Sequence, residues 1–236
     1  MHIGEVFTRE PTVFAIGHFG LGYLEGKGTS KMLHTKLNLP LLLAVSVIPD
    51  MDLILQYLYP GLFMHRGPTH SIVVFTVLMI PFFIMYRKQA APYYAALLSH
   101  SLIGDYFTGG IELFWPVSQQ WFGFGNLGVD SLLSVTAEIA LFAVALAIMF
   151  KTNDVRSLLE PNRNNLWLLI AFGAVLGPML SFSEGTGGTL PLLLVIPSLF
   201  CLALFGYSLL ISLRSFREKP SMPARPNKQE AGAGKT

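Results

Sequence analysis

The chain has 236 residues, of which 52% are hydrophobic and only 13% are charged, and its formal net charge is +2. Soluble domains average about 25% charged residues, so this composition excludes a soluble globular domain, a disordered chain and a nucleic-acid binder that relies on a basic face. The mean hydropathy of +0.53 instead predicts a protein that folds within a lipid bilayer.

Apolar runs follow one another along the whole chain. In the N-terminal half they are short or carry ionisable side chains, and they cover residues 13–24, 39–59, 71–86 and 92–107. Three further runs, 131–150, 166–182 and 190–213, approach the roughly 20 helical residues that cross about 30 Å of hydrocarbon. The pattern predicts an all-α, polytopic transmembrane bundle with about six or seven membrane segments.

Polar content divides the chain into three parts. Residues 1–128 form a membrane region that carries the candidate site, and residues 129–215 supply helices that complete the bundle. Residues 216–236 are basic, contain three prolines and have no apolar periodicity, so we expect a disordered tail. Lys and Arg gather at 27–36, 87–88 and 151–163 and in this tail, which predicts that these segments and the C-terminus are cytoplasmic.

Seven ionisable residues in the first half of the chain form the candidate metal site. A charged group at membrane depth costs at least about 2.5–3.5 kcal/mol, so each needs a partner or a function. Imidazole nitrogens and carboxylate oxygens together suit zinc first, with manganese or iron as alternatives. The candidate ligands are His18, Asp50, Asp52, His65, His70, His100 and Asp105.

The spacing of these residues favours a common site. Pro49 interrupts the preceding helix, which allows Asp50 and Asp52 to aim at one centre. In the segment 65–70, with the sequence HRGPTH, Gly and Pro shape a turn into the next helix, and we expect Thr69 to cap that helix.

His100 and Asp105 fit the site less simply. Residues five apart lie roughly 140° apart on an ideal α-helix, so a pocket would have to wrap around the helix that carries them. A hydrogen bond between these two residues alone is the competing interpretation.

The order of these motifs resembles the YdjM-like family of inner-membrane metal-dependent hydrolases. The motifs are GH at 17–18, PDMD at 49–52, HRGPTHS at 65–71, and SH at 99–100 with Asp105, so the resemblance covers about residues 15–125. It implies a helical protein that binds a divalent metal and hydrolyses a substrate. We therefore expect an integral protein of the cytoplasmic (inner) membrane of a bacterium or archaeon.

The residues and the resemblance together predict hydrolysis of an ester or phosphoester. A metal would activate a water, and Arg66 would neutralise negative charge that develops on the substrate. Either Asp52 or Asp105 would act as the general base, and the sequence does not choose between them. Because the site is expected near the membrane interface, a lipid or lipid-linked substrate is favoured, and no nucleic-acid partner is expected.

Two other classes of protein fit the same residues. An ion- or proton-coupled transporter would place the ionisable groups along a path across the bilayer and would contain inverted repeats, which the sequence does not show. A non-enzymatic membrane assembly protein would hold a structural metal with complete coordination. Alternatively, Asp50 and Asp52 form a buried ion pair with Arg66 or bind a coupling proton.

Overall fold

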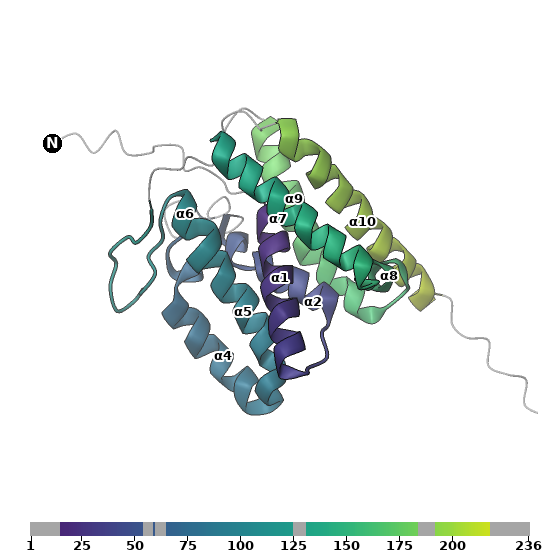
Figure 1. The fold of residues 1–236 in the computed structure, drawn as a ribbon, viewed down its shortest axis with the longest axis horizontal. Coiled ribbons are helices and arrows are strands. Elements are labelled where there is room, and N and C mark those ends of the chain that lie inside the picture. Colours follow the sequence, from purple (N-terminus) through teal and green to yellow (C-terminus); the bar gives the residue numbers. More distant parts are fainter. Residues whose placement is uncertain (1–14, 54–58, 60–64, 125–130, 184–191, 218–236) are drawn as a thin grey trace, which may run out of the picture.

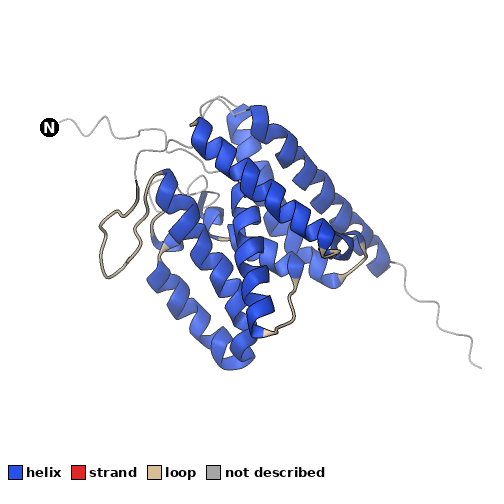
Figure 2. Cartoon of the chain, in the orientation of Figure 1, coloured by secondary structure: helices blue, strands red, loops and turns tan. Residues whose placement is uncertain are grey.

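The computed structural model describes residues 15–53, 59, 65–124, 131–183 and 192–217, and these are helical with short connections (Figure 2). In the described part of the chain, β-pairing is limited to a single antiparallel bridge between Ile111 and Phe122. The predicted all-α class is therefore confirmed. The tail predicted to begin at residue 216 lies outside the described residues from residue 218 onward, and residues 216 and 217 belong to the last helix.

The helix α1 (Ala15–Leu33) lies at the centre of the bundle (Figure 1). It packs against α2 (Leu39–Val47) and α5 (Ala91–Ser99), which belong to the predicted region 1–128, and against α7 (Leu132–Lys151), which belongs to the predicted region 129–215. The other α-helices given by the described residues are α4 (Ile72–Tyr86), α6 (Tyr106–Thr108), α8 (Asp154–Leu159), α9 (Leu168–Ser183) and α10 (Leu192–Arg217). The two predicted halves thus share α1 as a common packing surface.

Glycines allow α1 to approach its neighbours closely. A Cβ on Gly20 would lie 2.8–2.9 Å from backbone atoms of Leu141 and Phe142 on α7, and a Cβ on Gly22 would run into Ser46 on α2. Such contacts between small residues and facing backbones are typical of helices packed inside membranes. The absence of a side chain at Gly20 and Gly22 therefore lets α1 pack closely against α7 and α2.

Among the described residues, three helices are long and apolar enough to cross a membrane, judged by length and composition. They are Ile72–Thr108 with 37 residues, Leu132–Lys151 with 20 and Leu192–Arg217 with 26. The prediction of six or seven membrane segments is therefore higher than the structure supports. Several predicted runs form helices of only 9 to 16 residues, such as α2 and α9, and at 1.5 Å per residue these fall short of about 30 Å.

The longest of these three helical segments, Ile72–Thr108, is not straight but folds into a hairpin of two arms, α4 and α5–α6. The hydroxyl groups of Thr76 and Tyr94 lie 2.7 Å apart, although residues separated by 18 positions would be about 27 Å apart along a straight helix. The reversal occurs at Arg87, whose φ of 51° lies in the left-handed region. Consequently α4 and α5 lie side by side and enclose a small core around Phe75 and Met79.

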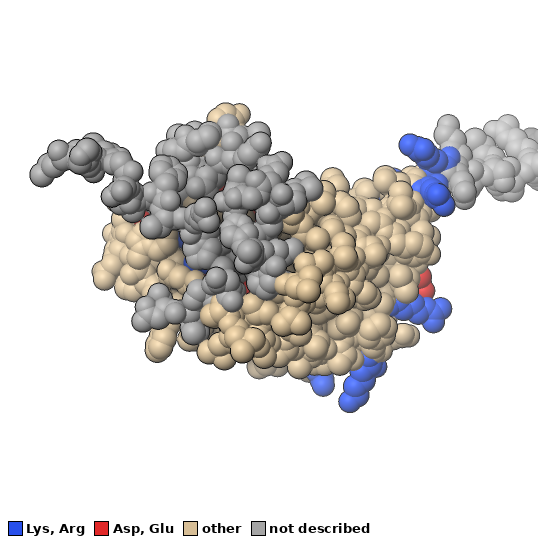
Figure 3. All heavy atoms as spheres, turned by 90° about the horizontal axis from the view of Figure 1, so that it is seen from above, with Lys and Arg blue, Asp and Glu red and all other residues tan. Residues whose placement is uncertain are grey.

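The outer surface of the bundle is largely apolar. Figure 3 shows one face on which the visible surface carries few charged atoms, and the Lys and Arg side chains gather at its edges. Leu132, Leu192 and Ile196 are each at least 75% exposed. Exposed hydrophobic area of this extent is unfavourable in water, and it fits contact with lipid.

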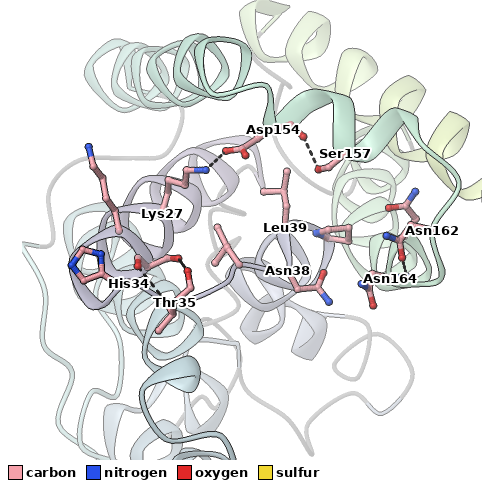
Figure 4. A pocket seen from close by; sticks show the side chains of 14 residues that line it. Lys27, His34, Thr35, Asn38, Leu39, Asp154, Ser157, Asn162 and Asn164 are labelled. Atoms are coloured by element: carbon pink, nitrogen blue, oxygen red, sulfur yellow. Dashed lines mark hydrogen bonds and ion pairs between the residues drawn. The ribbon is translucent and has the colours of Figure 1, made fainter.

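Asp154, at the start of α8, is hydrogen-bonded to the middle of α1. Its Oδ2 accepts hydrogen bonds from Lys27 Nζ at 2.6 Å, from the Tyr23 hydroxyl at 2.7 Å and from the Thr152 hydroxyl at 2.8 Å. Burial by itself would raise the pKa of Asp154, but these three donors outweigh it and hold the pKa below its ordinary value. Figure 4 shows Lys27 pointing at Asp154 across the mouth of a polar pocket of about 510 Å³, which contains none of the predicted site residues.

We expect Asp154→Asn to lower the stability of the protein at neutral pH by about 1–3 kcal/mol, because three donors lose a charged acceptor. The contribution of Asp154 is complete above the ordinary carboxyl pKa and is lost as the pH falls below it. Thermal unfolding in detergent at several pH values measures both effects. Glu160→Gln, which removes an exposed carboxylate paired with Arg156, is the control and should change little; an equal loss in both variants would contradict the prediction.

Candidate metal centre

Two carboxylates of the site lie where α2 is interrupted. The helix α2 ends at Val47, and Pro49 begins the short 3-10 helix η1 (Pro49–Met51). Proline has no N–H to continue the helical hydrogen bonds. Asp50 lies in η1 and Asp52 directly follows it, and both side chains are buried. The predicted break at Pro49 is confirmed, and it places both carboxylates inside the bundle.

The segment 65–70 forms a turn followed by the 3-10 helix η2 (Pro68–His70). The side chain that caps α4 is that of Ser71, which accepts hydrogen bonds from the N–H groups of Val73 and Val74. The expectation that Thr69 caps this helix is therefore wrong. The Thr69 hydroxyl instead donates a short hydrogen bond to the Asp52 carboxylate, so it serves the site.

His100 and Asp105 are the first and last residues of the π-helical segment η4 (His100–Asp105). The N–H of Tyr106 bonds to the carbonyl of Ser101, five residues back, which is the hydrogen-bond pattern of a π-helix. This wider turn brings residues five apart to the same side, and His100 Nε2 lies 3.2 Å from Asp105 Oδ2. The predicted separation of about 140° assumed α-helical geometry, and the π-helical turn removes it.

Four ligand atoms from three different segments face one another. His70 Nε2 lies 3.5 Å from Asp50 Oδ1 and 3.2 Å from Asp105 Oδ2. His100 Nε2 lies 3.3 and 3.2 Å from the same two oxygens, and the two nitrogens are 3.2 Å apart. Zinc bound tetrahedrally at about 2.0–2.1 Å separates its ligands by about 3.3–3.4 Å. These five separations fit a tetrahedral ligand set.

The other ring nitrogens hold the imidazoles in place. His100 Nδ1 lies 2.7 Å from the carbonyl oxygen of Ser46, which can only accept, so Nδ1 carries the proton and the Nε2 lone pair faces the cluster. His70 Nδ1 contacts the Thr69 hydroxyl at 3.0 Å, and that hydroxyl donates to Asp52. His65 Nδ1 contacts Asp52 directly at 2.9 Å. Carboxylate and carbonyl partners of this kind orient histidine ligands in metal sites.

The charges in the cluster are unbalanced. Asp50, Asp52 and Asp105 bring three buried carboxylates, and in the described part of the chain Arg66 is the one Lys or Arg side chain paired with any of them. With neutral imidazoles the cluster therefore carries a charge of −2. Burying uncompensated charge is costly, and a divalent cation would neutralise it.

His18 faces the same centre from α1. Its ring stacks on that of His100 with centroids 3.8 Å apart, and its Nε2 lies 4.0 Å from Asp50 Oδ2 and 3.9 Å from Asp105 Oδ1. Among the described residues, neither ring nitrogen of His18 has a hydrogen-bond partner, although the side chain is buried. Gly104 makes this position possible, because a Cβ there would collide with the His18 ring.

Arg66 lies on the side of the cluster next to α6. Its Nη2 lies 3.2 Å from Asp105 Oδ1 and donates to the Thr108 hydroxyl at 3.2 Å. The guanidinium is buried. A cation fixed against a ligand carboxylate in this way could also hold a substrate phosphate or carboxylate, because its five N–H donors can serve several oxygens.

The structure brings all the predicted site residues together. Two overlapping groups have ligand atoms within 4.8 Å of one another, the first made of His18, Asp50, His100 and Asp105, and the second of Asp50, His65 and His70. Asp52 lies behind His65 and His70. The sequence did not predict that Thr69 and the carbonyl of Ser46 orient the histidines. A backbone carbonyl is present in every residue, so the residue type at position 46 does not indicate this role.

The fold and the site define a helical membrane protein with a buried cluster of histidine and aspartate ligands. A family model described as "YdjM inner membrane protein" matches residues 14–184, so the chain belongs to that family. This confirms the family resemblance, and together with the apolar helices it supports a location in a membrane. Neither the curated proteins nor the solved structures include a match to the chain.

Proposed function

We propose that this protein is a membrane-embedded, metal-dependent hydrolase that cleaves an ester or phosphoester of a lipid-like substrate. The observation that carries the proposal is the set of four ligand atoms on Asp50, His70, His100 and Asp105, separated by 3.2–3.5 Å and adjoining a buried arginine. Zinc bound tetrahedrally fits these separations. A divalent ion bound by three of these four atoms would keep one position for a water molecule, and it would lower the pKa of that water toward neutrality.

Two further groups suit the chemistry of hydrolysis. Arg66 would bind the anionic part of the substrate and stabilise charge that develops during cleavage. His65 and Asp52 form a hydrogen-bonded pair at 2.9 Å, and His65 Nε2 has no hydrogen-bond partner among the described residues. A histidine oriented by a carboxylate is a common general base. These contacts support a proposal in which Asp105 is a ligand and His65 transfers the proton, with Asp52 positioning His65.

A structural metal in a non-enzymatic protein is the second candidate. It is favoured by one observation, that four protein atoms at tetrahedral spacing would complete the coordination of zinc. His18 and His65, whose nitrogens face the cluster without hydrogen-bond partners among the described residues, favour the catalytic role.

The experiment uses the full chain in lipid nanodiscs that contain phosphatidylglycerol and phosphatidic acid. We expect release of fatty acid, diacylglycerol or phosphate, detected by mass spectrometry, to stop on chelation and to return when zinc, manganese or iron(II) is restored. His65→Ala should retain metal and fold but lose activity by about 10²–10⁴-fold. Loss of thermal stability on chelation, with no product from any of these lipids or from soluble esters and phosphoesters, would support the structural role instead.

A further inference from the structure

A cavity of about 250 Å³ opens beside the metal centre, between α7 and the end of the α4–α6 hairpin. Most of its lining surface is apolar, although Ser134 and Glu138 on α7 also line it. The residues that shape its walls include Leu21 on α1, Ile103 and Phe107 near the end of the hairpin, and Leu133 and Ala137 on α7. The cavity therefore differs from the polar pocket at the other end of α1.

One end of this apolar groove reaches the metal centre. His18, whose Nε2 faces Asp50 and Asp105, lines it, and so does Gly104, which packs against the His18 ring. Thr108 also lines it, and the hydroxyl of this residue accepts a hydrogen bond from Arg66. The polar groups that line or adjoin this end thus include a candidate metal ligand and a residue bonded to the buried guanidinium.

The other end of the groove lies on the lipid-facing surface. Leu133 is 63% exposed, and Ile103 and Phe107 are each more than 40% exposed. Leu133 belongs to α7, which is long and apolar enough to cross a membrane, and Ile103 and Phe107 lie in the second arm of the apolar hairpin Ile72–Thr108. A molecule in the bilayer could therefore enter sideways, without leaving the hydrocarbon phase.

We propose that this groove holds the hydrocarbon chain of an anionic amphiphile whose head group reaches Arg66 and the metal centre. A largely apolar groove that ends beside the Arg66 guanidinium and the metal centre matches the shape of such a molecule. Burial of the hydrocarbon chain would supply affinity, and the polar head group would fix its position. The assignment rests on the proposed function. It adds the route by which the substrate enters from the bilayer, and it identifies the groove as the part of the protein that sets the preferred length of the substrate's hydrocarbon chain.

Binding is tested first, because it does not depend on catalysis. Full-length protein in nanodiscs is irradiated with phosphatidic acid that carries a diazirine on one acyl chain, and the labelled residues are mapped by mass spectrometry. We expect labelling at Ile103, Phe107, Leu133 or Ala137. Ala137→Trp fills the groove, because Ala137 lines it, and should reduce this labelling about tenfold, as expected when roughly two methylene groups lose their buried position.

Ala143→Trp is the matched control, because Ala143 is an exposed alanine on the same helix that does not line the groove. It should leave the labelling unchanged. Labelling spread evenly over the outer faces of α7 and α10, or an equal effect of the two variants, would overturn the assignment and show ordinary contact with bilayer lipid.

Activity separates this inference from the proposed function. Ala137→Trp should raise KM for a long-chain ester or phosphoester about tenfold and leave cleavage of a short-chain, water-soluble one unchanged. If the protein is labelled in the groove but cleaves neither substrate, the groove is kept as a lipid site and the proposed hydrolase activity is rejected. If both substrates are cleaved and Ala137→Trp affects neither reaction, the groove is rejected as the lipid site and the proposed hydrolase activity is kept.

Discussion

His70→Ala protein is expected to lose the divalent metal that wild-type protein retains through purification. His70 supplies the Nε2 atom that lies within 3.2–3.5 Å of the other three ligand atoms, so its removal leaves three ligands and an uncompensated cluster of carboxylates. Elemental analysis of detergent-purified protein should find about one or two equivalents in wild type and a trace in the variant. Zinc is the expected element, with manganese or iron as alternatives.

A second histidine provides the control for this measurement. His34 is exposed at the end of α1 and lies away from the cluster, so His34→Ala should keep the metal of wild type. If His70→Ala does not fold, the thermal stability of wild type is measured with and without added metal, since a ligand at 100 times its Kd stabilises the native state by about 2.7 kcal/mol. Wild-type protein that contains no metal and gains no stability from zinc, manganese or iron would contradict the metal centre and return the transporter to consideration.

Asp52→Asn should have a different effect from loss of a ligand. Asp52 contacts His65 Nδ1 at 2.9 Å and accepts from Thr69, so it positions two imidazoles from behind. Replacing such a carboxylate typically lowers metal affinity about 10–100-fold. We expect metal titration to show weaker binding with the same number of ions at saturation.

Two comparisons make this prediction specific. Asp154→Asn removes a carboxylate that accepts three hydrogen bonds on α8, outside the cluster, so it should reduce stability without changing metal affinity. Complete loss of one metal equivalent in Asp52→Asn, even at saturation, would show that Asp52 is itself a ligand. Unchanged affinity would falsify its positioning role.

Several features of the site were predictable because chemistry constrains them strongly. Ionisable residues inside apolar runs are costly in a membrane, so His18, Asp50, His100 and Asp105 stood out without any knowledge of the fold. Pro49 also predicted the break that carries the first carboxylates, and the structure has that break. The family resemblance extended these inferences to an inner-membrane protein, and the match over residues 14–184 confirms that membership.

Other features depend on local geometry that residue type does not encode. The π-helical turn at His100–Asp105 changes which residues share a face, and a histidine and an aspartate five positions apart do not signal it. Likewise, Ser71 and Thr69 are both able to cap α4, and their different roles follow from the position of Asp52. The hairpin at Arg87 joins two of the predicted apolar runs in one helical segment, and other runs, such as those of α2 and α9, form helices too short to cross a membrane.

By itself, the sequence determined that this protein is helical, belongs in a membrane and carries a set of potential metal ligands, because composition and the cost of burying charge depend on residue type alone. The tertiary structure decided which atoms face one another. The ligands come from α1, η1, η2 and η4 and are separated by up to 87 residues, from His18 to Asp105, and their convergence depends on how these segments pack. The lipid-facing groove beside His18 is likewise a product of packing, since its walls come from three helical segments that are distant in the chain.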